Sequence, residues 1–363
     1  MTPQTPVTVL TGYLGSGKTT LLNRILTADH GKKFAVIVNE FGEIGIDNDL
    51  IVESDEEIYE MNNGCVCCTV RGDLVRVVQG LLKRKGRFDG ILVETTGLAD
   101  PAPVAQTFFM DEDVRAKAKL DAVVAMVDAK HFGLRLKDAP EAEDQVAFAD
   151  VVVLNKTDLV SADELEALRT TVRKINPHAV IHTSERSNVA MDVVLDRGAF
   201  DLDRILENDP HFLHAEDHDH PDHECGPACH HHGHAHADAA EHVHDHECGP
   251  SCDHESHKLD PATHDVSVTS VSLRAGDMDH EKFFPWINKL TQMDGPDILR
   301  LKGIVAFKGD EDRFVIQGVH MIVEGDHQRP WREDETRETR MVFIGRNLDT
   351  EKIERTFNAC IAV

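Results

Sequence analysis

Short apolar runs recur along the first 200 positions of the chain and alternate with segments of helical periodicity. The runs cover residues 7–10, 34–38, 90–93, 122–127, 151–154 and 179–182. They are almost continuously apolar, which is typical of parallel strands that helices cover on both faces. We therefore predict a doubly wound, mostly parallel α/β domain over residues 1–207.

A histidine-rich segment interrupts this pattern. Fifteen histidines fall between His211 and His257, and no lysine or arginine occurs from Ile205 to His257. Such a composition cannot bury enough apolar surface to offset the entropy lost when a chain becomes ordered. Residues 208–260 are accordingly predicted to form a disordered linker.

Ordered patterning returns after this linker. Residues 266–273, 304–307, 314–323 and 341–344 have the apolar content of strands, and residues 281–290 and the stretch after Asp349 have helical spacing. Strands mixed with two helices predict a smaller α+β domain over residues 261–363.

The composition narrows the function classes. Apolar residues make up 41% of the chain, but no run approaches the roughly 20 residues of a bilayer-spanning helix, so no membrane partner is expected. Residues 1–6 show neither a secretory nor a transit signal, which favours the cytoplasm. In that reducing compartment the eight cysteines are better explained as metal or redox ligands than as disulfides. The net charge of −27 argues against a nucleic-acid partner.

A phosphate-binding loop follows the first predicted strand. The sequence from Gly12 to Thr19 matches G-x-x-x-x-G-K-[ST], and a helical pattern begins at Thr19. Backbone N–H groups of such a loop surround the β- and γ-phosphates, while Lys18 supplies a cation and the Thr19 hydroxyl can reach Mg²⁺. This is a P-loop NTPase signature. The expected nucleotide contacts are Gly12, Gly15, Ser16, Gly17, Lys18, Thr19 and Thr20.

An N-K-x-D motif follows the predicted strand at residues 151–154 and supplies Asn155, Lys156 and Asp158. An aspartate at this position can accept hydrogen bonds from both N1–H and the exocyclic amine of guanine. Adenine lacks that pair of donors, so ATP would leave a buried acceptor unpaired. The motif therefore predicts GTP as the nucleotide.

Two further segments supply candidate catalytic residues beside Lys18 and Thr19. Glu94 directly follows the predicted strand at 90–93, where a P-loop NTPase places a second Mg²⁺ or water ligand. Residues 39–47 combine acids with glycines, as a loop that reorders around the γ-phosphate requires, and contain Glu43 and Asp47. The alternative is that these acids only solvate a surface loop.

Three thiols lie close together at Cys65, Cys67 and Cys68, between a predicted strand at 58–61 and a helix that begins near residue 70. Alternate residues of extended backbone face the same side, so Cys65 and Cys67 can converge and Cys68 can join them through a turn. Thiolates favour Zn²⁺ over Mg²⁺, and three of them leave a tetrahedral shell incomplete, which suits a transferable ion. Glu40, Glu43, a histidine or water could complete the shell. The alternative is a set of buried core cysteines.

The linker holds a second, weaker set of metal ligands. The pattern His-Glu-Cys-Gly-Pro-x-Cys occurs twice, and more histidines lie between the copies. Many ligand arrangements of modest affinity can form in a disordered chain, which predicts a metal-collecting arm. The alternative is a linker without a role in activity. The ligands concerned are Cys225, Cys229, Cys248, Cys252, His230, His231 and His232.

Together these motifs resemble those of the CobW-type P-loop GTPases, which are metallochaperones related to the nickel-inserting GTPases of urease and hydrogenase maturation. The resemblance covers nearly everything outside the linker and includes residues 94–101, 317–320 and 342–345. Residues 12–15, 39–43 and 120–130 are most similar to the branch of zinc-regulated GTPase metalloprotein activators. Eukaryotic members of that branch carry an amino-terminal Cys-Pro docking motif that residues 1–6 lack, so their client is not assumed.

The resemblance implies a CobW-type C-terminal domain and a metal site at Cys65, Cys67 and Cys68 that is coupled to Mg²⁺-GTP. The expected function is GTP-dependent delivery of Zn²⁺ to a client metalloprotein. Delivery of Co²⁺, for cobalamin synthesis or to a nitrile hydratase, is the alternative within this class. A zinc store built on the histidine-rich arm is the alternative from another class. We also expect the C-terminal domain to dock clients. His320 is expected to be a core residue rather than a ligand. A homo-oligomer is a further possibility that the sequence does not decide.

Overall fold

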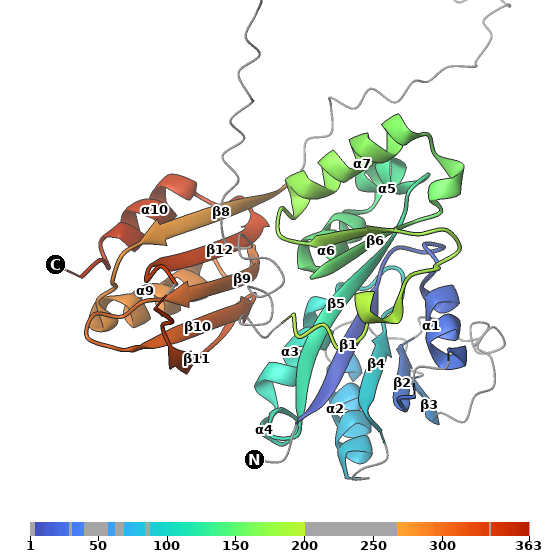
Figure 1. Ribbon diagram of the computed structural model, residues 1–363, viewed down its shortest axis with the longest axis horizontal. Helices are drawn as coiled ribbons and strands as arrows, with labels where there is room; N and C mark the ends of the chain where they lie inside the picture. Colours follow the sequence, from blue (N-terminus) through green and yellow to red (C-terminus); the bar gives the residue numbers. More distant parts are fainter. Residues whose placement is uncertain are drawn as a thin grey trace, which may run out of the picture. The chain divides into compact units, whose positions relative to one another are not determined.

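The computed structural model describes residues 4–28, 31–39, 57–61, 69–83, 88–199, 267–333 and 335–362. These residues fall in one compact unit, which contains two β-sheets (Figure 1). The predicted linker lies outside the described residues, and the domain limits at 207 and 260 stay predictions.

The first sheet, as far as the chain is described, has seven strands in the order β3-β2-β4-β1-β5-β6-β7. All neighbouring strands are parallel, which confirms the predicted fold class. β1 lies between β4 and β5. Because the three strands are parallel, the loops that follow them lie next to one another at the carboxyl edge of the sheet. The strands are β1 (Thr5–Thr11), β2 (Phe34–Asn39), β3 (Glu57–Met61), β4 (Gly90–Glu94), β5 (Ala118–Asp128), β6 (Val151–Asn155) and β7 (Val180–Thr183).

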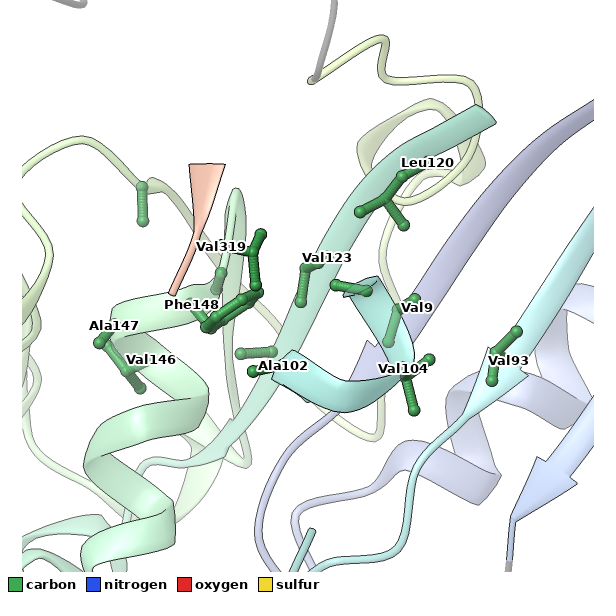
Figure 2. Packing of buried hydrophobic residues seen from close by; sticks show 14 of the residues in the cluster. Val9, Val93, Ala102, Val104, Leu120, Val123, Val146, Ala147, Phe148 and Val319 are labelled. Carbon is green, nitrogen blue, oxygen red and sulfur yellow. The ribbon is translucent and has the colours of Figure 1, made fainter. Parts of the chain in front are cut away.

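Helices cover both faces of this sheet, because alternate residues of each buried strand point to opposite sides. Val7 and Val9 of β1 belong to one apolar cluster, with α2 (Thr69–Leu82), α3 (Ala102–Met110), α6 (Pro140–Phe148) and α7 (Ala162–Ile175). Leu10 belongs to the other, with α1 (Lys18–Thr27). Figure 2 shows members of the first cluster. Two short helices, α4 (Glu112–Arg115) and α5 (Phe132–Asp138), precede and follow β5.

The second sheet is antiparallel, in the order β11-β10-β9-β12-β8, and confirms the predicted α+β domain. The helices α9 (His280–Met293) and α10 (Thr350–Asn358) pack on it through Phe283 and Phe357. Asp349 starts α10, because its side chain accepts a hydrogen bond from the backbone N–H of Lys352 (3.0 Å). The strands are β8 (Val268–Ala275), β9 (Ile298–Val305), β10 (Asp312–Val319), β11 (Ile322–Pro330) and β12 (Thr339–Arg346).

Three sequence predictions in this sheet are wrong. Residues 314–323 do not form one strand: β10 ends at Val319 and β11 begins at Ile322, with His320 in the left-handed conformation at φ 52° between them. His320 is a half-buried turn residue and not a core histidine. The strand predicted at 304–307 is in fact β9, which runs from Ile298 to Val305. Its first half was missed because Arg300 and Lys302 interrupt the apolar pattern, although both are buried.

Arg300 and Lys302 contact the first sheet. The guanidinium of Arg300 and the ammonium of Lys302 both bind the Asp150 carboxylate, the latter at 2.7 Å. Asp150 precedes β6 and also accepts a hydrogen bond from the backbone N–H of Val123 (2.8 Å). Burial, with a smaller contribution from the neighbouring Arg300, lowers the pKa of Lys302 to about 8. Phe148 of α6 and Val319 of β10 add apolar contacts between the sheets (Figure 2).

Within the described ranges, no helix is both long enough and apolar enough to cross a bilayer.

Candidate functional site: a nucleotide-binding edge

The P-loop connects β1 to α1 at the carboxyl edge of the parallel sheet, and its glycines are required by the backbone. Gly12 has φ 138°, and a Cβ there would lie 2.3 Å from the carbonyl oxygen of Met126. Gly17 has φ 105°, and a Cβ there would lie 2.4 Å from the Asn155 amide nitrogen. Only glycine combines this conformation with such close approach. α1 begins directly after Gly17, so the N–H groups of its first turn face the loop.

Two side chains of the motif point to the carboxyl edge of the sheet. Lys18 Nζ donates hydrogen bonds to the carbonyl oxygens of Gly12 (2.6 Å) and Tyr13 (3.3 Å), which keeps its ammonium over the loop. Thr19 Oγ1 donates to Glu94 Oε1 at the end of β4 (3.2 Å). A hydroxyl and a buried carboxylate thus meet beside the P-loop, while their predicted role as magnesium ligands stays a prediction.

Asn155 joins the P-loop to the loop after β7. Its Nδ2 donates to the carbonyl oxygen of Ser16 (2.9 Å) and to Ser187 Oγ (3.1 Å), and its Oδ1 accepts from the backbone N–H of Ser187 (2.8 Å). Ser187 Oγ donates in turn to the Gly17 carbonyl oxygen (2.9 Å). Asn155 is therefore a positioning residue that fixes the P-loop, while the nucleotide contact predicted for it stays a prediction.

Lys156 and Asp128 form an ion pair beside the P-loop. Lys156 adopts φ 62°, and its Nζ lies 2.7 Å from Asp128 Oδ2 at the end of β5. His131 Nδ1 lies 3.0 Å from the same oxygen. Burial acts to raise the pKa of Asp128, but the hydrogen bonds from Lys156 and His131 outweigh it, so the pKa is lowered. The carboxylate thus stays charged and holds the lysine in place.

Three of the remaining predicted nucleotide contacts are accessible, whereas the Ser16 side chain is buried. Asp158, Gly15 and Thr20 are exposed, so a ligand can reach them. A cavity of about 160 Å³ lies at this edge, lined in part by Gly15, Asp128 and Lys156.

Sequence reasoning missed Ser187 and the role of Asp128. Ser187 lies in an irregular loop without a recognisable motif, where it is fully buried and has φ 56°. Asp128 gave a usable signal, because it is an acid at the carboxyl end of a buried strand beside the P-loop.

Comparisons with known proteins agree with this geometry. Residues 6–183 match the family model of the CobW/HypB/UreG nucleotide-binding domain, and residues 268–361 match that of the cobalamin synthesis protein cobW C-terminal domain. The zinc chaperone YjiA of Escherichia coli is 32% identical over 356 residues, which cover 97% of each chain. The chain belongs to the CobW/HypB/UreG family. The zinc-regulated GTPase metalloprotein activator 1 of Schizosaccharomyces pombe is 41% identical over 203 residues, 54% of this chain and 49% of that protein.

A solved structure supports the same assignment across both sheets. The crystal structure of Zn(II)-bound YjiA GTPase from E. coli superposes with a TM-score of 0.69 at 26% identity, and the match covers 99% of this chain and 100% of that chain. This CobW/HypB/UreG protein and YjiA therefore share the order of a P-loop domain followed by a C-terminal domain.

The predicted zinc ligands of this CobW/HypB/UreG protein lie outside the described residues. They are Glu40, Cys65, Cys67, Cys68, Cys225, Cys229, Cys248, Cys252, His230, His231 and His232. The predicted catalytic residues Glu43, also a candidate zinc ligand, and Asp47 lie outside the described residues as well, whereas the predicted magnesium ligands Thr19 and Glu94 are described. In the part of the chain that the structure does describe, no three His, Cys, Asp or Glu side chains are grouped as a metal site.

Cys360 is the remaining cysteine, and it differs from the predicted ligands. It is buried in the core of the second sheet, where burial raises the pKa of its thiol. A raised pKa disfavours the thiolate that metals bind, so Cys360 is a core residue.

Proposed function

We propose that this GTPase is a zinc metallochaperone, in which hydrolysis of GTP to GDP and phosphate is coupled to delivery of Zn²⁺ to a client metalloprotein. The observation that carries the proposal is the meeting of Thr19 and Glu94 beside a fully formed P-loop. The full-length similarity to a zinc chaperone supports zinc as the cargo.

Guanine selectivity is assigned to Asp158. The Asn155 hydrogen bonds and the Lys156–Asp128 ion pair fix the backbone on its N-terminal side, and its own carboxylate is exposed. A fixed backbone with a free carboxylate suits recognition of the two guanine donors.

Thr19 and Glu94 also fit a magnesium ion. Mg²⁺ prefers hard oxygen ligands, and a hydroxyl and a carboxylate oxygen 3.2 Å apart provide two of them. The ion would neutralise charge on the β- and γ-phosphates. Lys18, held over the loop by the Gly12 carbonyl oxygen, would contribute a further positive charge.

The zinc site is assigned to Cys65, Cys67 and Cys68, with Glu40 as a further ligand. This segment follows β3, and the loop with Glu43 and Asp47 follows β2. β2 and β3 are neighbouring parallel strands, so both segments begin at the carboxyl edge that also holds the P-loop. A loop that reorders around the γ-phosphate can therefore alter the metal site.

Metal analysis of the full chain loaded with GTP or GDP tests this function. The wild type should retain more zinc with GTP than with GDP, and Cys67→Ala should lose that difference. Cys360→Ala is the matched control, because Cys360 lies in the core of the C-terminal domain, and the difference should persist there. A nucleotide-dependent difference that survives in Cys67→Ala would overturn the cysteine assignment.

A zinc store is the second candidate, favoured by the fifteen histidines between His211 and His257. Deletion of residues 208–258 distinguishes the two. If nucleotide-linked zinc binding disappears, the store is supported, and if it persists, the cysteine site is supported. The same metal analysis with Co²⁺ in place of Zn²⁺ decides between the two candidate cargoes. Docking of the client on the C-terminal domain, and assembly into a homo-oligomer, belong to the same proposal.

A further inference from the structure

The helix α6 contacts the loop that follows Glu94. Gln145 Nε2 donates hydrogen bonds to the carbonyl oxygens of Gly97 (3.1 Å) and Ala99 (3.2 Å). Gln145 is 1% exposed, so water does not compete for these bonds. A side chain from a helix distant in sequence thus fixes the backbone just after the predicted magnesium ligand.

The same loop lies directly against the P-loop. The backbone N–H of Thr95 donates to the carbonyl oxygen of Leu10 (2.9 Å). A Cβ on Gly97 would lie 2.6 Å from the backbone nitrogen of Leu14, so the two loops are in close contact. A displacement of Gly97 is therefore transmitted to the phosphate-binding loop.

Other residues of α6 contact the C-terminal domain. Glu143 accepts hydrogen bonds from the backbone N–H of Val268 (3.1 Å) and from Ser267 Oγ (2.5 Å), at the start of β8. Asp144 pairs with Arg346 at the end of β12 (2.5 Å). Glu143 is 7% exposed, so its hydrogen bonds to Ser267 and Val268 are largely shielded from solvent and from screening by salt.

The helix is short enough to move as one body. Nine residues span about 13 Å, and Asn176 Nδ2 holds its carboxyl end by donating to the carbonyl oxygens of Val146, Ala147 and Ala149. The Gln145 bonds are already at the long end of the usual range, so a shift of about 0.5 Å would break them. A shift of α6 by this distance relative to the loop would therefore break the two Gln145 hydrogen bonds.

We propose that α6 transmits the position of the C-terminal domain to the loop after Glu94, with Gln145 as the positioning residue at the nucleotide end. The inference rests on the proposed GTPase site. A partner that binds the C-terminal domain and shifts α6 then changes the rate of GTP hydrolysis without touching the nucleotide.

Gln145→Met tests the nucleotide end, because methionine has a similar length but cannot donate a hydrogen bond. We expect kcat for GTP to fall by about tenfold, the effect of losing one or two hydrogen bonds to a positioned loop. KM should change by less than about twofold, since the hydrogen bonds of Gln145 go to Gly97 and Ala99, neither of which is a predicted phosphate or base contact. If the methionine variant folds poorly, Gln145→Asn replaces it in the test. Asparagine keeps the amide but has a shorter reach, so it should also lower kcat.

A double-mutant cycle tests the coupling. Arg346→Ala breaks the contact between β12 and α6, whereas the control Lys352→Ala breaks an ion pair with Asp294 that lies wholly within the C-terminal domain. Arg346→Ala should change kcat at least about twofold in the wild type and leave it unchanged in a Gln145→Met background, because interacting sites are not additive. Lys352→Ala should leave kcat unchanged in both backgrounds.

The outcomes separate the inference from the function it rests on. A wild-type chain that hydrolyses no GTP contradicts the proposed GTPase site. If the wild type is active but Gln145→Met lowers only the melting temperature, Gln145 is purely structural and the inference is overturned. If the effects of Gln145→Met and Arg346→Ala multiply independently, α6 carries no coupling and the inference is overturned.

Discussion

Replacing Asn155 by alanine is the substitution whose effect follows most directly from the geometry. Asn155 is 1% exposed and makes three hydrogen bonds, two to Ser187 and one to the Ser16 carbonyl oxygen. Alanine removes all three, and leaves the Ser187 N–H and the Ser16 carbonyl group in the protein interior without their partner. We therefore expect Asn155→Ala to reduce both stability and nucleotide binding.

The magnitude can be worked from these bonds. Leaving a buried polar group unsatisfied costs about 1–3 kcal/mol, and the affected groups share one network, so their costs are not independent. A total of about 3 kcal/mol is expected. At about 2–4 °C per kcal/mol for a domain of this size, the melting temperature should fall by about 6–12 °C.

Thermal unfolding with and without GDP measures both effects. The wild type should be stabilised by GDP, and the variant should gain less, because ligand stabilisation falls as the dissociation constant rises. Asp158→Ala is the matched control: its side chain is exposed, so melting without ligand should hardly change while the gain from GDP is lost. If Asn155→Ala melts within about 2 °C of the wild type, the network does not stabilise the loop as argued.

Three more substitutions give separate tests. Gly12→Ala should abolish GDP binding in a calorimetric titration, because its Cβ would lie 2.3 Å from a backbone oxygen, whereas Gly133→Ala, with no atom within 4 Å, should bind normally. Equal binding by both variants would contradict the account of the P-loop. Asp158→Asn should lower affinity for GTP and raise it for xanthosine triphosphate, whose C2 oxygen can accept from the new amide; unchanged selectivity would show that Asp158 does not read the base. Lys302→Met should remove a rise in the free energy of unfolding between about pH 8 and 10.5, because the folded lysine, with its pKa lowered by burial to about 8, releases its proton before the unfolded one does. The free energies of unfolding of wild type and variant are measured by urea denaturation over this pH range. If they change with pH in the same way, the pKa of Lys302 is not lowered in the folded state.

The nucleotide edge was predictable because its residues are constrained locally. Gly12 and Gly17 need left-handed backbone and close packing, and such needs appear directly as glycines at fixed spacing. Glu94 and Asn155 both end apolar strands, and parallel strands bring their carboxyl ends to one edge. The sequence alone therefore brought these four positions together.

The C-terminal sheet was less predictable because its charges are satisfied by distant residues. Arg300 and Lys302 make β9 look like a surface strand, yet all eight of its residues are buried. Both cations bind the carboxylate of Asp150, which directly precedes β6 of the other sheet. The partner lies about 150 positions earlier, and no local pattern reveals it. The turn at His320 was missed for a similar reason, because a histidine at positive φ gives no glycine or asparagine signal.

The same reasoning explains why Gln145 drew no attention. A glutamine on a short helix has no motif, and its role depends on the backbone of a loop 46 and 48 positions away. Only the folded chain shows that one nine-residue helix touches both the loop after Glu94 and the start of β8.

The central claim is that bound guanine nucleotide and thiolate-bound zinc influence one another. The most direct test is a chelator competition that gives the Zn²⁺ dissociation constant of the chain without residues 208–258, once with a non-hydrolysable GTP analogue and once with GDP. The account predicts tighter zinc binding with the analogue, by a factor of about 5 to 150, and the same factor for the effect of zinc on nucleotide affinity. Equal zinc affinity in the two nucleotide states would contradict it.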